Sequence, residues 1–180
     1  SGISIVRVET DGKQSLWSYA GNRPLALLTN VDNLGYYTWL DVETVAMVLV
    51  DEPPRLAIAT VPNGAIAEIP VQPGRSLQRV PAIGTLSFVD KSNDDTWWIS
   101  DYDRHSGKIR RIAPALADSE DFAWTPEGEL LMASGRLLYI WRDEWELIAD
   151  LSDRVSGAIT RIAVGPNGRQ IAFVTLEGGL

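Results

Sequence analysis

Short apolar runs recur along the whole chain and are separated by polar turns that contain glycine, proline, asparagine or aspartate. Within many of the runs apolar and polar residues alternate, which is the period of a β-strand. The segments Thr10–Gly12, Pro62–Gly64 and His105–Gly107 have the composition of tight turns between such strands. The pattern therefore predicts a chain of short antiparallel strands with no long helix.

The turns also recur at a nearly fixed period. Phe122–Gly128 and Ile162–Gly168 are apolar runs that end in a Pro-x-Gly turn, and Gln78–Gly84 and Tyr37–Glu43 occupy equivalent places, the last without the glycine. The last turn positions are 43, 84, 128 and 168, which are 41, 44 and 40 residues apart. Four strands in a repeat of about 42 residues are typical of a β-propeller blade. We therefore expect an all-β fold of four-stranded propeller blades.

The repeat register predicts where each blade begins. It gives one propeller domain, or a fragment of one, over residues 1–180. Complete blades are expected at 34–75, 76–116 and 117–157, and partial blades at 3–33 and 158–180. The predicted strand count is 17, whereas a four-bladed ring needs 16 strands and a six-bladed ring needs 24. We therefore expect an incomplete propeller whose open strand edges favour self-association.

The segment that begins at Trp145 fits two patterns. Ile148 and Leu151 follow it near helical spacing, whereas Leu147 and Ala149 alternate with it as in a strand. The repeat register places a fourth strand here, so we expect a strand.

Three motifs resemble a known family. The Pro-Glu-Gly turn at 126–128 and the Pro-Asn-Gly turn at 166–168 resemble the propeller repeats of the TolB-like family, and Trp97–Lys108 is similar to that family's third strand and outer hairpin. The resemblance covers essentially the whole chain. It implies a partner-binding propeller in the periplasm or outside the cell, the substrate-gating propeller of a larger hydrolase such as a prolyl-oligopeptidase-like peptidase, or a lyase that acts in its channel.

Charge and composition narrow the classes of partner. The chain has 16 Lys and Arg residues against 24 Asp and Glu residues, a net charge of −8, which repels phosphate backbones and argues against nucleic acid. No apolar run is long enough to insert into a membrane. Cysteine is absent, which excludes disulfides, thiolate nucleophiles and cysteine-based metal sites. We expect a protein or peptide partner, or a small ligand in the central channel.

The sequence contains few of the residue arrangements that catalytic and metal sites require. The single histidine, His105, stands beside Ser106, and adjacent residues do not form the hydrogen bond between a nucleophile and its base. The acidic loop 90–95 lacks the ligand spacing of a calcium loop. We therefore expect no catalytic residues, no cofactor and no metal, with His105 at an exposed hairpin tip.

The seven tryptophans fit a structural role. Trp39 and Trp124 occupy the same repeat position, and Trp17, Trp98 and Trp141 fall in third strands. Because aromatic side chains dominate packed interfaces, we expect most of them to pack blades together. A platform for carbohydrate or peptide is the alternative.

A column of polar residues precedes the innermost strands, which line the central channel of a propeller. The connections that lead into these strands form one rim, and polar groups from separate blades meet there. The candidate binding residues are Tyr36, Arg75, Ser76, Glu120, Asp121, Thr160 and Arg161. The alternative is that the rim is polar only because it is solvated. The sequence as a whole favours a non-catalytic propeller that recognises a protein or a ligand.

Overall fold

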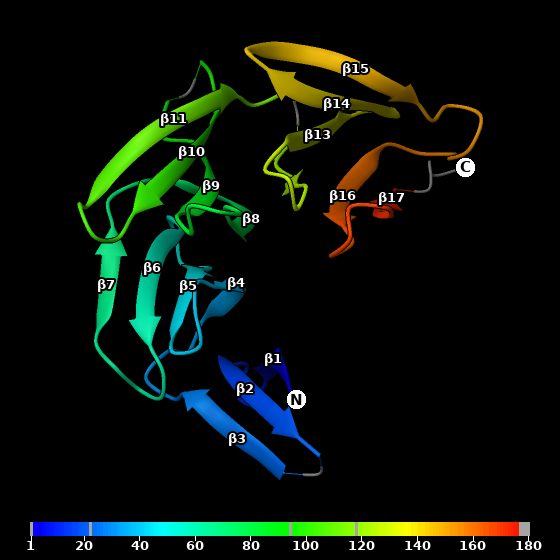
Figure 1. The fold of residues 1–180 in the computed structure, drawn as a ribbon. Coiled ribbons are helices and arrows are strands. Elements are labelled where there is room, and N and C mark those ends of the chain that lie inside the picture. Colours follow the sequence, from blue (N-terminus) through cyan, green and yellow to red (C-terminus); the bar gives the residue numbers. More distant parts are fainter. Residues whose placement is uncertain (1, 22, 94, 118, 177–180) are drawn as a thin grey trace. The chain divides into compact units, whose positions relative to one another are not determined.

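The computed structural model describes residues 2–21, 23–93, 95–117 and 119–176. In these ranges the chain has 17 strands and no helix (Figure 1). The strands form five antiparallel sheets of three, four, four, four and two strands. The predicted all-β class, the four-stranded blades and the strand count are confirmed. The chain divides into two compact units, Ser1–Pro73 and Gly74–Leu180.

The first unit contains two sheets. One is β1 (Ile3–Val8), β2 (Gln14–Ala20) and β3 (Arg23–Leu28), and the other is β4 (Leu34–Trp39), β5 (Thr44–Leu49), β6 (Arg55–Thr60) and β7 (Ile66–Ile69). Both sheets contribute to one apolar core, in which Leu16 and Leu28 from the first sheet are packed with Leu34 and Met47 from the second. These four side chains are fully buried, so burial of apolar surface holds the two sheets together.

The second unit contains three sheets. The first consists of β8 (Pro73–Arg79), β9 (Leu86–Asp90), β10 (Trp98–Asp103) and β11 (Lys108–Pro114). The second consists of β12 (Phe122–Trp124), β13 (Leu130–Ser134), β14 (Leu137–Arg142) and β15 (Glu144–Asp150). The third consists of β16 (Ile159–Val164) and β17 (Ile171–Thr175). Strand β8 begins at Pro73, so the predicted blade boundary between residues 75 and 76 falls inside a strand. That boundary was placed from the turn spacing, which does not report where the preceding strand starts.

Two apolar clusters hold the second unit together. Val89, Ile99 and Phe122 join the sheets of β8–β11 and β12–β15. Ala123, Leu131, Ile140, Ile159 and Ile162 join the sheet of β12–β15 to β16. Successive sheets therefore pack face to face through alternating apolar side chains, as propeller blades do.

The repeated Pro-x-Gly turns form equivalent hairpins. The amide of Gly128 donates to the carbonyl of Thr125 at 2.9 Å, and the amide of Gly168 donates to that of Gly165 at 2.9 Å. Both glycines have positive φ, 88° and 69°, which explains the choice of glycine at the end of each turn. The turns join the first and second strands of two successive sheets, β12 to β13 and β16 to β17.

The segment that begins at Trp145 is a strand. Strand β15 pairs with β14 in antiparallel register, with Trp145 opposite Trp141. The two rings meet edge to face with centroids 5.3 Å apart, and the indole of Trp145 donates to the carbonyl of Pro114 at 2.8 Å. The prediction of a fourth strand is confirmed.

Tryptophans join neighbouring sheets in both units. The indole of Trp39 at the end of β4 donates to Ser4 Oγ of β1, and the indole of Trp124 at the end of β12 donates to Ser87 Oγ of β9, each at 2.8 Å. In each case the first strand of one sheet is bonded to a strand of the preceding sheet, β1 or β9. We call this contact the Trp–Ser bridge. The expected packing role is confirmed for these two tryptophans.

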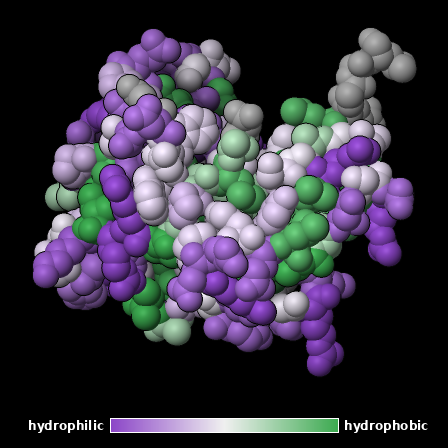
Figure 2. Space-filling model, turned by 90° about the horizontal axis from the view of Figure 1, so that it is seen from above, coloured by the Kyte–Doolittle hydropathy of each residue, from purple (hydrophilic) through white to green (hydrophobic). Residues whose placement is uncertain are grey.

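The surface mixes hydrophilic residues with exposed apolar ones, as the face drawn in Figure 2 shows. Large apolar side chains that are more than half exposed include Ile3 and Val8 on β1 and Val174 on β17. Within the described part of the chain no helix has the length and apolar character needed to cross a bilayer.

Candidate functional site

Six of the seven predicted rim residues lie in the second unit, where three segments bring them together. Arg75 and Ser76 are on β8, Thr160 and Arg161 are on β16, and Glu120 and Asp121 immediately precede β12. These segments are bonded to one another through the residues named. The predicted convergence of separate blades therefore occurs within this unit. Tyr36 lies on β4 of the first unit.

Glu120 contacts strand β8 and Lys91, the residue that follows β9. Its Oε2 accepts the backbone amide of Arg75 at 3.2 Å, and its Oε1 pairs with Lys91 Nζ at 2.9 Å. Burial alone would raise the pKa of Glu120, but the hydrogen bond and charge of Lys91 and the amide of Arg75 lower it overall. The close approach depends on Gly74, where an added Cβ would lie 3.0 Å from Val89 Cβ and 3.2 Å from Glu120 Oε2.

Asp121 links β12 to the following sheet. Its Oδ1 accepts the backbone amide of Ile162 on β16 at 3.1 Å, and the residue is only 8% exposed. Burial raises the pKa of Asp121, although the amide of Ile162 and the charges of Arg161 and Arg75 work in the opposite direction. The adjacent carboxylates therefore both join sheets, with pKa values shifted in opposite directions.

A cavity of about 350 Å³ opens beside these residues. Arg75, Ser119, Glu120, Ser134 and Thr160 supply its polar lining. Its other lining residues are Ala117, Ala133, Gly135, Ala158, Ile159 and Leu176. This volume lies at the lower end of the range of ligand pockets. The lining combines a small apolar wall with one charged end, so it suits a short group with a polar head.

The guanidinium of Arg75 is incompletely satisfied. Its Nη2 donates to the carbonyl of Thr160 at 2.9 Å, whereas its Nε is buried without a hydrogen-bond partner. Buried donors in proteins are nearly always paired, so an unpaired one in a cavity wall marks a position where an acceptor would be favourable.

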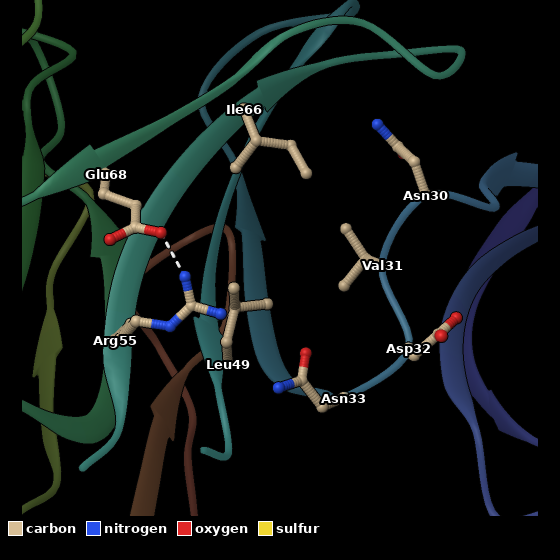
Figure 3. A pocket seen from close by; sticks show the side chains of 8 residues that line it. All are labelled: Asn30, Val31, Asp32, Asn33, Leu49, Arg55, Ile66 and Glu68. Carbon is tan, nitrogen blue, oxygen red and sulfur yellow. Dashed lines mark hydrogen bonds and ion pairs between the residues drawn. The ribbon is translucent and has the colours of Figure 1, made fainter. Parts of the chain in front are cut away.

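A second cavity, of about 250 Å³, lies in the first unit beside the connection between β3 and β4. Figure 3 shows Arg55 and Glu68 facing one another on one side, with Asn30 and Val31 on the other. Arg55 is also paired with Asp51 at 2.5 Å, and these partners raise its pKa. The charged groups of this cavity are thus largely bonded to one another.

His105 lies in the hairpin that joins β10 and β11, and its side chain is 83% exposed. Its Nδ1 is 3.4 Å from Asp103, whose pKa is lowered mainly by a hydrogen bond from Ser106. The acidic loop 90–95 is a hairpin connection stabilised by bonds from backbone amides to Asp90 and Asn93, and Asp94 lies outside the described residues. Among the residues that the structure describes, no group of three or more acidic or histidine side chains is placed to hold a metal ion.

Several features of the site carry no clear sequence signal. Ala117, Ala133 and Ala158 line the cavity, but alanine is equally common in cores. Ser4 and Ser87 were missed, although each lies 35 to 37 residues before its tryptophan. A search for polar residues at this spacing before Trp39 and Trp124 would have found them.

The repeated four-stranded sheets, their hairpins and the packing of successive sheets within each unit define a protein built of β-propeller blades. No protein-family model matches the chain, and no curated protein matches it. Solved structures support the fold. The chain is similar to a chain of a nidogen/laminin complex, with a TM-score of 0.72 and 10% identity over 97% of this chain and 67% of that one. It is also similar to TolB from Acinetobacter baumannii, with a TM-score of 0.69 and 16% identity over 98% of this chain and 47% of that one.

A third similar structure is virginiamycin B lyase from Staphylococcus aureus, with a TM-score of 0.58 and 14% identity over 94% of this chain and 62% of that one. The chain thus spans about half to two thirds of the length of these propellers. The resemblance to TolB-like repeats holds at the level of the fold, and these neighbours differ in what their names say they do.

Proposed function

We propose that the chain is a non-catalytic recognition propeller that binds a protein or peptide partner at the rim of the unit Gly74–Leu180. The observation that carries this proposal is the cavity of about 350 Å³ lined by Arg75, Glu120 and Thr160, which come from three sheets. Polar groups that converge on a partly apolar cavity are typical of binding sites. The similarity to a chain of a nidogen/laminin complex supports a protein partner.

The arrangement of the polar groups supports a binding role over catalysis. Glu120 and Asp121 are occupied in bonds that join sheets, and His105 is at an exposed hairpin tip. A general base has to reach a nucleophile or a substrate proton in a shared pocket. We further propose that the propeller works in the periplasm or outside the cell, which the resemblance to TolB-like repeats supports.

Capture of partners with a blocked variant tests the site. Ala158 lies at the cavity and is exposed, so Ala158→Trp fills the cavity without burying a polar group. Ile148→Trp on the outer strand β15, where Ile148 is 48% exposed, is the matched control. A partner retained by the wild type is purified, and its affinity is measured by calorimetry. We expect Ala158→Trp to weaken binding about tenfold or more and Ile148→Trp to change it less than about twofold.

Equal binding by the wild type and Ala158→Trp would place the partner elsewhere and overturn the proposed site. The proposed lack of catalysis has its own test. Peptide, ester and uronate substrates are expected to show no turnover above that of the buffer. Turnover that disappears in His105→Ala would contradict a non-catalytic role.

A further inference from the structure

Arg75 is a charged side chain of the rim whose guanidinium is only partly paired among the described residues. Its guanidinium makes one hydrogen bond, from Nη2 to a neutral carbonyl oxygen of Thr160, and its Nε is buried without an acceptor. Among the described residues no carboxylate forms an ion pair with it, although its charge acts on Glu120 and Asp121. A guanidinium in a cavity wall thus retains unused capacity to bind an anion.

The nearby carboxylates are committed to other bonds. Glu120 uses one oxygen for Lys91 and the other for the backbone amide of Arg75. Asp121 accepts the amide of Ile162, and its burial disfavours the ionised form. Turning either carboxylate toward the guanidinium would break a bond that joins two sheets. Among the residues that the structure describes, neither nearby carboxylate is free to act as an acceptor for Arg75, so a ligand is the more favourable source.

The geometry of the guanidinium defines the kind of acceptor. Nε and Nη2 lie on the same edge of an arginine, and this edge binds the two oxygens of a carboxylate through parallel hydrogen bonds. In Arg75 this edge contains the unpaired Nε and the singly bonded Nη2. Because Nε is buried, the guanidinium has to turn toward the cavity, and only the bond to Thr160 is lost in that movement.

We propose that the cavity receives a carboxylate of a bound peptide, held by the Nε–Nη2 edge of Arg75. The short apolar stem of the ligand packs on Ala117, Ala133 and Ala158 in the same cavity. The volume of about 350 Å³ is suited to one side chain or one chain terminus. This inference rests on the proposed recognition function and defines what the rim recognises.

Three synthetic peptides test the inference: acetyl-Ala-Glu-Ala-amide, its Gln counterpart, and acetyl-Ala-Ala with a free carboxyl terminus. Binding is followed by two-dimensional NMR, which also reports the Nε–H signals of arginine. The protein variants are Arg75→Gln, Arg75→Lys and, as the matched control, Arg79→Gln, which removes an exposed arginine from the same strand. Circular dichroism verifies that each variant is folded.

We expect at least one of the two carboxylate peptides to bind about tenfold or more tightly than the Gln peptide and to shift the Nε–H signal of Arg75. The comparison of the Glu peptide with the free terminus shows which carboxylate the site prefers. Arg75→Gln should abolish the preference, Arg75→Lys should retain only part of it because the fork is lost, and Arg79→Gln should leave it unchanged.

Three results would each overturn the inference. The Glu and Gln peptides could bind equally while the free terminus does not bind, or the preference could persist in Arg75→Gln. The third is no binding of either carboxylate peptide up to ~10 mM. If a partner is blocked by Ala158→Trp while Arg75→Gln binds it normally, the carboxylate inference is wrong and the proposed function stands. If the carboxylate preference is found while no partner depends on the cavity, the proposed protein-binding function is the one that fails.

Discussion

Strands β9 and β17 belong to the same unit, stand second in their sheets and have nearly the same sequence pattern, Leu-Ser-Phe-Val-Asp and Ile-Ala-Phe-Val-Thr. Their environments differ sharply. Phe88 and Val89 of β9 are fully buried, whereas Phe173 and Val174 of β17 are 37% and 55% exposed. Strand β9 has β8 on one side and β10 on the other, and β17 belongs to a two-stranded sheet with β16.

The comparison shows that strand formation and burial are separate consequences of the sequence. The apolar pattern is sufficient to predict that both segments are strands. Flanking strands and the neighbouring sheets decide whether the same side chains become core. Strand propensity measures how well a residue fits a pleated surface, and that fit depends on context. The first unit repeats the contrast, because β5 is almost wholly buried and β1 is largely exposed.

The strongest test of the comparison truncates the same residue type in both strands. Phe88→Ala should lower the free energy of unfolding by about 3–5 kcal/mol, because it leaves a cavity in the core. Phe173→Ala should cost less than about 1 kcal/mol, because its side chain is already partly in water. Denaturant unfolding of each variant measures the difference. Equal costs would mean that β17 is buried in solution and that the contrast between the strands is wrong.

The Trp–Ser bridges permit a smaller test, which compares the central strand β9 with the edge strand β1. Ser87 on β9 is fully buried and also donates to the carbonyl of Gln78 at 2.9 Å, whereas Ser4 on β1 is half-buried. Ser87→Ala should cost about 1–3 kcal/mol, since it leaves the buried indole N–H of Trp124 unpaired. Ser4→Ala should cost less, because water can replace the hydroxyl. Thermal unfolding of the two variants, with the exposed Ser106→Ala as the control, provides the comparison.

The test with the smallest expected effect compares the two carboxylates that precede β12, Glu120 and Asp121. The lowered pKa of Glu120 implies stability that is present above its unfolded value and lost as the pH falls through its folded value. The raised pKa of Asp121 implies the reverse, because its ionisation on going to neutral pH disfavours the folded state. Glu120→Gln should therefore cost on the order of 1 kcal/mol at pH 7 and almost nothing at low pH.

For Asp121→Asn, whose amide oxygen can still accept from Ile162, we expect the opposite slope. The variant should gain stability relative to the wild type as the pH rises from about 3 to 7. Urea unfolding across this range checks both slopes. Parallel curves for the two variants would show that the adjacent carboxylates do not have different environments.

Much of the fold could be predicted because its determinants are local. The glycines at 128 and 168 with their prolines specify hairpins, and the spacing of these turns specifies the repeat. Glu43 replaces glycine in the equivalent turn, where the side chain of Asp41 accepts the amide of Glu43 at 2.9 Å and stabilises the turn by another route. Turns that are stabilised in this way have no fixed sequence motif, so the turn at Glu43 is hard to recognise from the repeat pattern alone.

The proximity of three candidate residues could be predicted, but the contacts among them could not. The repeat register placed Arg75, Glu120 and Thr160 on one rim, and the structure brings them into direct contact. The sequence does not reveal that Glu120 pairs with Lys91 or that Arg75 Nε has no acceptor. Those features depend on side-chain directions and on distances between sheets, and a period of about 42 residues determines neither.

The pairing of strands also has a consequence for the order of folding. Every pairing between named strands joins consecutive strands of the chain, from β1 with β2 to β16 with β17. A ribosome adds about 5–20 residues per second, so a repeat of this length takes several seconds to emerge, whereas a hairpin forms in roughly 1–10 μs. Each sheet can therefore be complete before the next has been synthesised. We expect the chain to fold sheet by sheet from its N-terminal side, and each finished sheet then provides the apolar face on which the following one condenses.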